Sequence, residues 1–330
     1  MNGGSASVQA HLMRRARWGN AEIAFWILLV LLIFALPSRA LLINEILIAG
    51  LFAMSLDLIL GYAGILSLGH AAFFGIGAYG AAILASHGVN DPLVGLILAS
   101  LIAGLAGLAT APLVLRGSDL TRLMVTLGIC LMLGELANRN SWATGGADGL
   151  NLELTPIFGL FPIGFTGQRN AALYSLTALF LLFALARRIV QSPFGLSLRG
   201  LRENRLRAGA LGISPPRRLI AIYAIAAAYA GAAGALVAQT TQIVSLDVFD
   251  FHRSADVMLM LIIGGTGFLY GGIIGAALFI AIKDGLSTVT PEYWEFWIGL
   301  LLVALVLAGR ERIGARIAGL LPRRSLGSAR

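Results

Sequence analysis

The stretch from Gly61 to Leu84 constrains the fold more than any other part of the chain, because it carries no charged residue and yet is rich in glycine. It reads GYAGILSLGHAAFFGIGAYGAAIL, which is long enough to cross a bilayer as a helix, since a crossing takes about 20 residues. Glycine weakens a helix in water, whereas in lipid small residues let two helices approach closely. Small residues four apart, suited to such packing, stand at Ala71/Gly75, Gly77/Ala81 and Ala78/Ala82.

Two polar residues, Ser67 and His70, lie within this stretch. Their spacing of three places them on one face of a continuous helix. Polar groups at membrane depth often belong to a solute pathway. The alternative is a tightly packed structural helix in which His70 bonds a neighbour, and the residues alone leave both readings open.

The composition is that of a membrane protein. Charged residues make up 12% of the chain and hydrophobic residues 58%, whereas a soluble domain has about 25% charged residues. The net charge of +8 comes from arginine, since Lys283 is the only lysine. The arginines cluster between apolar runs, as the positive-inside rule expects, which argues against a nucleic-acid partner. Cys130 is the only cysteine, so the chain can form neither an internal disulfide nor a cysteine-based metal site.

The apolar segments predict an all-α, polytopic bundle of about ten membrane spans. They lie at about 22–37, 41–60, 63–86, 92–115, 120–138, 171–187, 219–240, 254–264, 272–283 and 294–308. Three arginine-rich stretches should face the cytoplasm: tail 1–21, a loop at about 191–218, and tail 310–330. The permease domain is then 22–309, with both termini inside. Two termini on the same side require an even number of spans. The eighth and ninth segments must therefore be separate spans, with GGTGFLYGG turning between them.

Two further expectations concern the chain outside these spans. The first apolar run could be a cleaved signal peptide, because arginines precede it and Ser38–Ala40 follows it. Since more spans follow at once, we expect an uncleaved first helix. On the outer face, Asn140–Asn170 is predicted to form an irregular cap. The glycine turns at Gly61–Gly64 and Gly264–Gly272 lie at comparable places in the two halves, as in transporters with internal repeats.

The central loop is the second informative region. A short amphipathic helix is predicted there, ended by Gly212 and by the prolines that follow it. Its apolar face would comprise Leu201, Leu206, Ala210 and Leu211, surrounded by Arg199, Arg202, Arg205 and Arg207. Such a helix either rests on the lipid surface or docks a partner. Charge alone favours a plain positive-inside loop.

Several motifs, in order, resemble the permeases of branched-chain amino acid ATP-binding-cassette (ABC) importers of the LivM type. They cover about residues 40–308 and comprise GYAGILSLGHAAFFGIGAY, TLG at 126–128, TGGADGL at 144–150, SPFGLSLRGLRENRLRAGALGI at 192–213 and LMLIIGGTGFLYGGIIGAAL at 259–278. The resemblance implies a type II ABC importer-like fold in the bacterial inner membrane. It also implies a second permease subunit, expected as a heterodimer, two cytoplasmic ATPases and a periplasmic binding protein.

The resemblance turns the central loop from a plain loop into a coupling helix seated on the ATPase. The coupling residues it implies are Arg202, Glu203, Asn204, Ala210, Leu211 and Gly212. The residues we expect to line the substrate pathway are Ser67, Gly69, His70, Thr126 and Gly128. Two positions depart from the family pattern: Asp57 stands where Asn is frequent, and Gly209 where Ala is usual. The family also includes permeases for urea and short amides.

Enzymatic readings have little support. A P-loop needs Gly-Lys-Ser/Thr, and Lys283 lies between Ile282 and Asp284. The four histidines have no metal-ligand spacing. We therefore expect a non-catalytic subunit without metal or cofactor, with ATP hydrolysis on a partner chain. The alternative is an ion-coupled secondary transporter or channel, which usually needs charged groups near the middle of the membrane.

Overall fold

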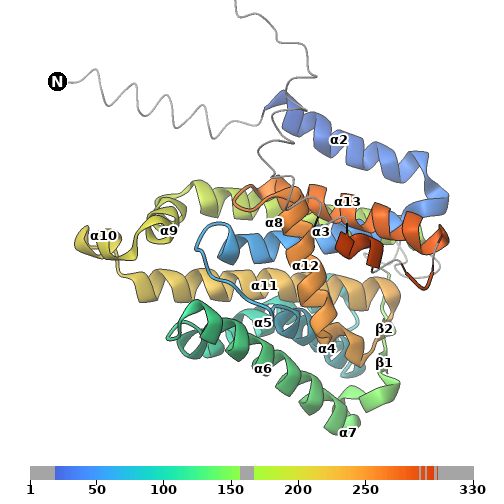
Figure 1. The fold of residues 1–330 in the computed structure, drawn as a ribbon. Helices are drawn as coiled ribbons and strands as arrows, with labels where there is room; N and C mark the ends of the chain where they lie inside the picture. Colours follow the sequence, from blue (N-terminus) through green and yellow to red (C-terminus); the bar gives the residue numbers. More distant parts are fainter. Residues whose placement is uncertain (1–18, 157–166, 290, 294–295, 301–302, 304–330) are drawn as a thin grey trace, which may run out of the picture. The chain divides into compact units, whose positions relative to one another are not determined.

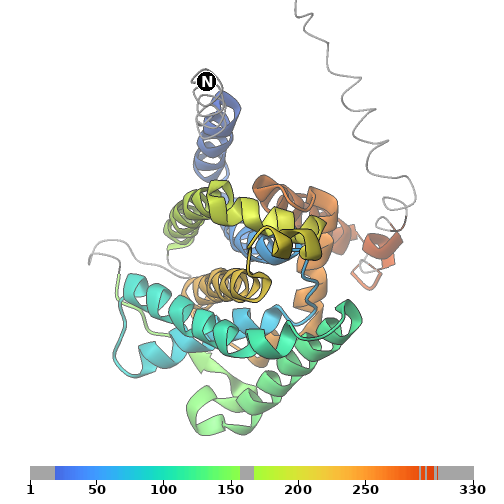
Figure 2. The same ribbon diagram turned by 90° about the vertical axis from the view of Figure 1, so that its left-hand side faces the viewer.

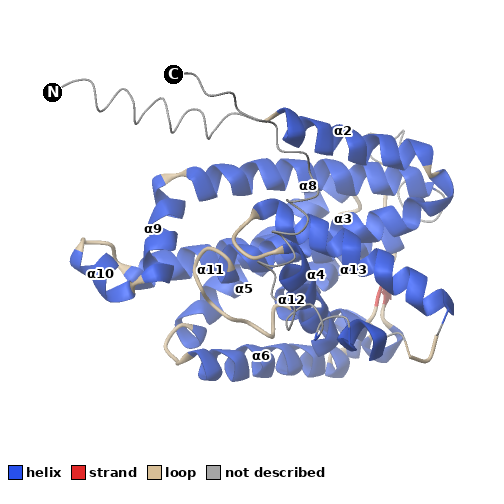
Figure 3. Ribbon diagram, turned by 45° about the horizontal axis from the view of Figure 1, so that its top comes forward, coloured by secondary structure: helices blue, strands red, loops and turns tan. Residues whose placement is uncertain are grey.

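The computed structural model describes residues 19–156, 167–289, 291–293, 296–300 and 303. Within these residues the fold is almost entirely helical, as predicted, with one small pair of strands (Figure 3). The long helices are α2 (Asn20–Ala35), α3 (Ala40–Leu60), α4 (Ala71–Ser86), α5 (Pro92–Val114), α6 (Asp119–Arg139), α8 (Gln168–Gln191), α11 (Pro215–Thr241), α12 (Phe251–Gly264) and α13 (Leu269–Val289). The chain divides into two compact units, of which the first ends at Ala277, and the arrangement described below is that of the first unit.

The structure identifies fewer membrane spans than the sequence predicts. Six described helices are long and apolar enough to cross a bilayer, including α3 with the short helix η1 (Pro37–Arg39) before it, and α2 and α4 are shorter apolar helices. The predicted eighth and ninth spans are separate helices, α12 and α13. However, α12 has only 14 residues, about 21 Å of helix against a hydrocarbon core of about 30 Å. The tenth segment and most of both predicted tails lie outside the described residues, so the count of about ten is not confirmed.

Helix α11 lies at the centre of the first unit, in contact with α3, α4 and α5 (Figures 1 and 2). Its sequence is rich in alanine and glycine, and α5 presents to it a buried stripe of small residues four apart: Ala99, Ala103, Gly107 and Ala111. A Cβ at Gly107 would lie 2.3 Å from that of Ala227. The opposite side of α5 carries exposed leucines such as Leu105. The small residues therefore set the packing between helices, and the leucines face outward, as expected toward lipid.

The glycine-rich stretch packs as its small residues predict. A Cβ at Gly77 would lie 2.0 Å from the carbonyl oxygen of Gly231, and one at Gly234 would lie 1.9 Å from that of Phe74. Helices α4 and α11 therefore touch backbone to backbone. No side chain larger than hydrogen fits at these two points, which is the physical reason for glycine there.

The predicted outer cap is more regular than expected. It contains helix α7 (Ser141–Thr144), the 3₁₀ turn η2 (Gly146–Asp148) and strand β1 (Leu150–Asn151). Strand β1 pairs in antiparallel register with β2 (Ile243–Val244), which is followed by the turn η4 (Leu246–Phe249). The predicted cap is thus joined to the segment after α11 by backbone hydrogen bonds. The part of this cap from 157 to 166 lies outside the described residues.

A buried polar node fixes α3, α8 and α11 to one another. The Asn44 amide nitrogen donates to the Thr240 hydroxyl at 3.1 Å, and the Ser175 hydroxyl donates to the Asn44 amide oxygen at 2.6 Å. All three side chains are buried. A side-chain hydrogen bond between membrane helices contributes about 0.6 kcal/mol on average and about 1.7 kcal/mol at most.

We expect Asn44→Leu to lower the free energy of unfolding by about 1–2 kcal/mol, because it removes both bonds and leaves the Ser175 hydroxyl without its acceptor. Unfolding of the purified protein in mixed micelles measures this. Ser100→Ala is the matched control, because in the described part of the chain the Ser100 hydroxyl donates only to the Leu96 carbonyl of its own helix. An equal loss in both variants would show that the node adds nothing to stability.

Candidate functional site: the break between α3 and α4 and the surface beneath it

The chain does not continue as a helix through the glycine-rich stretch. Helix α3 ends at Leu60 and α4 begins at Ala71, and the residues between them form a non-helical segment, which we call the break. Gly64 has φ +67°, in the left-handed region, where helices commonly end. The prediction of one span over 63–86 is therefore wrong in its first part. Non-helical backbone at membrane depth is tolerated only where it is buried in protein or lines a cavity.

Ser67 and His70 do not share a helix face, contrary to the prediction, because they lie in the break. Both are 1% exposed. The His70 Nε2 atom lies 2.8 Å from the Ser55 hydroxyl, and the imidazole stacks on Phe52 with ring centroids 5.6 Å apart. Among the described residues, neither the Ser67 hydroxyl nor the His70 Nδ1 atom has a hydrogen-bond partner.

Two neighbouring helices hold the break in place. The Leu68 N–H donates to the Thr126 hydroxyl of α6 at 3.3 Å. A Cβ at Gly69 would lie 1.8 Å from the Thr126 carbonyl oxygen, so the two backbones touch. On the other side, the Ala71 N–H donates to the Ser254 hydroxyl of α12 at 2.9 Å.

The structure thus brings together four of the five predicted pathway residues. Ser67, Gly69 and His70 lie in the break, and Thr126 packs on it. Gly128 does not join them. It is exposed, and it lies about 200° around α6 from Thr126, because successive residues of a helix are about 100° apart. Ser254 was missed because it lies far from the glycine-rich stretch in the sequence. Ser55 was missed because it stands in ordinary helical sequence within the preceding apolar segment.

The central loop forms two helices where one was predicted. These are α9 (Pro193–Glu203) and α10 (Arg205–Ala210). Asn204 separates them in an extended conformation, and its side-chain oxygen accepts the Arg207 N–H at 2.9 Å, which caps α10. The helix end predicted at Gly212 is confirmed, with φ +83°, and Pro215 begins α11.

The single apolar face predicted for this loop is wrong. The turn at Asn204 separates the side chains that would have formed it. Leu201 is buried, whereas Leu206 and Leu211 are 88% and 76% exposed. Of the other predicted coupling residues, Arg202, Glu203, Ala210 and Gly212 are also exposed. Two leucines surrounded by arginines therefore project from this end of the protein.

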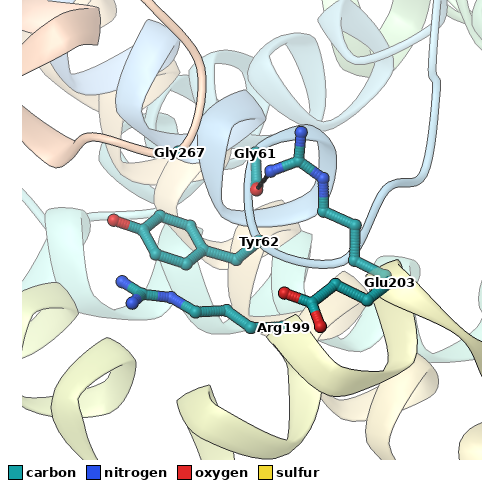
Figure 4. A pocket seen from close by; sticks show the side chains of 6 residues that line it. Gly61, Tyr62, Arg199, Glu203 and Gly267 are labelled. Atoms are coloured by element: carbon teal, nitrogen blue, oxygen red, sulfur yellow. Dashed lines mark hydrogen bonds between the residues drawn. The ribbon is translucent and has the colours of Figure 1, made fainter.

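Sequence reasoning missed the contact between α9 and the break. The Arg202 guanidinium donates to the carbonyl oxygen of Gly61. Beside it the Arg199 guanidinium lies over the Tyr62 ring, 5.1 Å from its centroid (Figure 4). Burial, and then the nearby Asp57 charge, raise the pKa of Tyr62 to about 12, so the phenol stays neutral at physiological pH. An open pocket of about 380 Å³ remains here, lined by Gly61, Tyr62, Arg199, Arg202, Glu203 and Gly267.

The two glycine turns that the sequence places at comparable positions touch each other. Asp57, in the last turn of α3, is fully buried, and its carboxyl oxygen accepts the Gly267 N–H at 2.7 Å. Gly267 lies in the turn between α12 and α13, with φ +80°. Asp57 thus uses its carboxyl group to hold the α12–α13 turn against the end of α3.

Comparison with known proteins assigns the chain to a family. The family model described as "branched-chain amino acid transport system / permease component" matches residues 38–306. Two relatives are the high-affinity branched-chain amino acid transport system permease proteins LivM of Salmonella typhimurium and Escherichia coli. Each is 30% identical in an alignment of 281 positions, which covers 78% of this chain and 65% of the relative.

A more distant relative is the autoinducer 2 import system permease protein LsrC of Photorhabdus laumondii, 26% identical over 57% of this chain and 56% of its own length. No solved structure matches. The family model covers most of the chain, including the break, α9, α10 and the α12–α13 turn. The chain therefore belongs to the family of branched-chain amino acid transport system permease components.

Proposed function

We propose that this chain is the membrane-spanning permease subunit of an ABC importer for branched-chain or related amino acids. The observation that carries the proposal is the exposed surface of α9 and α10, where Leu206 and Leu211 project among arginines at one end of the helices. A helix pair of this kind, outside the membrane spans, is suited to dock a partner. The permease names of the two LivM relatives agree with it.

The charge distribution supports this orientation. The arginine-rich end contains the C-terminus of α8, both short helices, the N-terminus of α11 and the α5–α6 connection (Figure 1). Its arginines are Arg116, Arg122, Arg187, Arg188, Arg199, Arg202, Arg205, Arg207, Arg217 and Arg218. The end with the strand pair has fewer arginines, Arg39, Arg139, Arg169 and Arg253, together with acidic residues such as Asp91, Asp148, Glu153 and Asp247. By the positive-inside rule the arginine-rich end faces the cytoplasm of a bacterial inner membrane, as both termini do.

The proposed pathway runs beside the break. Its irregular backbone and the Thr126 hydroxyl could exchange hydrogen bonds with a zwitterionic amino acid. So could the buried Ser67 hydroxyl and His70 Nδ1, which have no partner among the residues that the structure describes. Gly128 stays a prediction that this geometry does not support. The partners we propose are a second permease subunit against the outward-facing apolar helices, two ATPases beneath α9 and α10, and a periplasmic binding protein at the end with the strand pair.

Uptake by the assembled transporter tests the proposal. We expect proteoliposomes that contain this chain, its second permease and both ATPases to accumulate labelled leucine when ATP and the loaded binding protein are present. Without ATP, or with an ATPase unable to hydrolyse it, uptake should fall to the level of empty vesicles. A proton or sodium gradient alone should drive none. Gradient-driven uptake in the absence of the ATPases would show that the chain belongs to a secondary transporter instead. Competition by urea or short amides would change the proposed substrate class from amino acids to those compounds.

A further inference from the structure

Three elements distant in sequence meet at the cytoplasm-facing end of α3. They are the last turn of α3, the α12–α13 turn and helix α9. Asp57 bonds the Gly267 N–H, and Arg202 bonds the Gly61 carbonyl. We call these four residues the clasp.

The clasp is built on backbone contact, which leaves little freedom for one element to move without another. A Cβ at Gly61 would lie 2.1 Å from the Asp57 carboxyl oxygen and 2.4 Å from the Gly267 nitrogen. A Cβ at Gly64 would lie 3.1 Å from Cγ of Arg202, and one at Gly267 would lie 3.4 Å from the Arg202 guanidinium. Arg202 therefore packs against both glycine turns.

The clasp is connected to the break through α12 as well as through the chain itself. Just beyond the C-terminal end of α12, Gly267 is bound to Asp57. In its first turn, Ser254 accepts the Ala71 N–H, at the start of α4. Helix α12 is thus bonded at both ends to the segment that runs from α3 to α4. A displacement at one end of α12 is passed along a helix of about 21 Å to the other end.

We propose that Asp57, Gly61, Arg202 and Gly267 act as a positioning linkage that transmits the movement of α9 to the break, so that ATP hydrolysis by the partner opens the pathway. This rests on the proposed function, in which α9 and α10 dock on the ATPase. From α9, Arg202 donates a hydrogen bond to the backbone of the break at the Gly61 carbonyl. Asp57 then passes the movement to the α12–α13 turn. The hydrogen bond to Gly267 requires an acceptor at residue 57, which an amide oxygen can also supply.

The experiment compares Asp57→Ala with Asp57→Asn in the assembled transporter, with three readouts: binding of the ATPase subunits, ATP hydrolysis, and leucine uptake. We expect Asp57→Ala to bind the ATPases normally and to hydrolyse ATP within about twofold of the wild type. The amount of leucine carried per ATP should fall by about tenfold, the effect of losing one buried hydrogen bond. Asp57→Asn should retain coupling, because its amide oxygen accepts the same N–H.

Arg202→Ala provides a second variant on the exposed side of the linkage, where folding is not at risk. It should lower leucine uptake per ATP to a similar extent, and the double variant with Asp57→Ala should be no worse than either single variant, since both interrupt one linkage. Equal loss of uptake and ATP hydrolysis, normal coupling in Asp57→Ala, or additive losses in the double variant would overturn the linkage. Wild-type uptake without ATP would instead overturn the proposed function.

Discussion

Gly77→Ala should destabilise the protein strongly, because the added methyl group would lie 2.0 Å from the carbonyl oxygen of Gly231. A backbone atom cannot rotate away as a side chain can, so α4 and α11 must separate. Overpacking of this kind costs about 1–3 kcal/mol, and we expect about 3 kcal/mol here. The midpoint of thermal unfolding should fall by about 5–10 °C. The protein contains five tryptophans, so tryptophan fluorescence of the purified protein in detergent measures the change.

Gly80→Ala is the matched control, one turn further along the same helix. The nearest heavy atom to its added methyl would be the Ala99 Cβ at 3.6 Å, an ordinary van der Waals contact. Alanine also favours a helix over glycine by about 1 kcal/mol in water. We therefore expect no loss of stability. Equal destabilisation by both substitutions would show that α4 rejects any side chain there, and that contact with Gly231 is not the cause.

The second large effect is expected on binding to the ATPase subunits, from substitutions at the exposed leucines of the arginine-rich end. Leu206→Asp combined with Leu211→Asp should weaken the association with the ATPase subunits by at least about tenfold, because it would bury two unpaired carboxylates where leucine side chains make apolar contacts. Leucine uptake should fall in proportion, while the amount of folded chain in the membrane stays unchanged. The structure gives the reason for this separation: both side chains are largely exposed and support no internal packing. Co-purification with the ATPases and uptake in the same membranes measure the two effects.

Trp142→Asp controls for the introduced charge. Trp142 is as exposed as Leu206, at 88%, and lies in α7 at the opposite end of the helices. The Trp142→Asp variant should leave the association with the ATPases intact. If the paired leucine variant still binds the ATPases as tightly as the wild type, the docking surface lies elsewhere and the proposed roles of Ala210, Leu211 and Gly212 fail with it.

Much of the architecture could be read from the residues because local physical chemistry determines it. Long apolar runs must form helices in lipid, since every backbone polar group there needs an internal partner. Small residues four apart predicted the tight contact that Gly77 makes with Gly231. Arginines around residues 191–218 predicted a surface loop, and Gly212 its helix end.

The break was not predictable in the same way. From sequence, the segment after Gly64 is apolar enough to continue as a helix, and its spacing puts Ser67 and His70 on one face. What keeps it non-helical is a set of partners from elsewhere in the chain. The Thr126 hydroxyl accepts the Leu68 N–H, and the Ser254 hydroxyl accepts the Ala71 N–H. Sequence spacing carries no information about a partner that lies 58 or 183 residues away.

By itself, the sequence determined that this chain is a helical membrane protein, where most of its helices lie, and which family its motifs resemble. Only the tertiary structure decided that α9 contacts the break through Arg202, and that the Asp57 carboxyl group accepts the Gly267 N–H. Hydropathy and helix periodicity act within a segment and so can be read from it. A buried carboxyl group and the backbone N–H it accepts lie 210 residues apart, and only the packing of α3 against the α12–α13 turn brings them together.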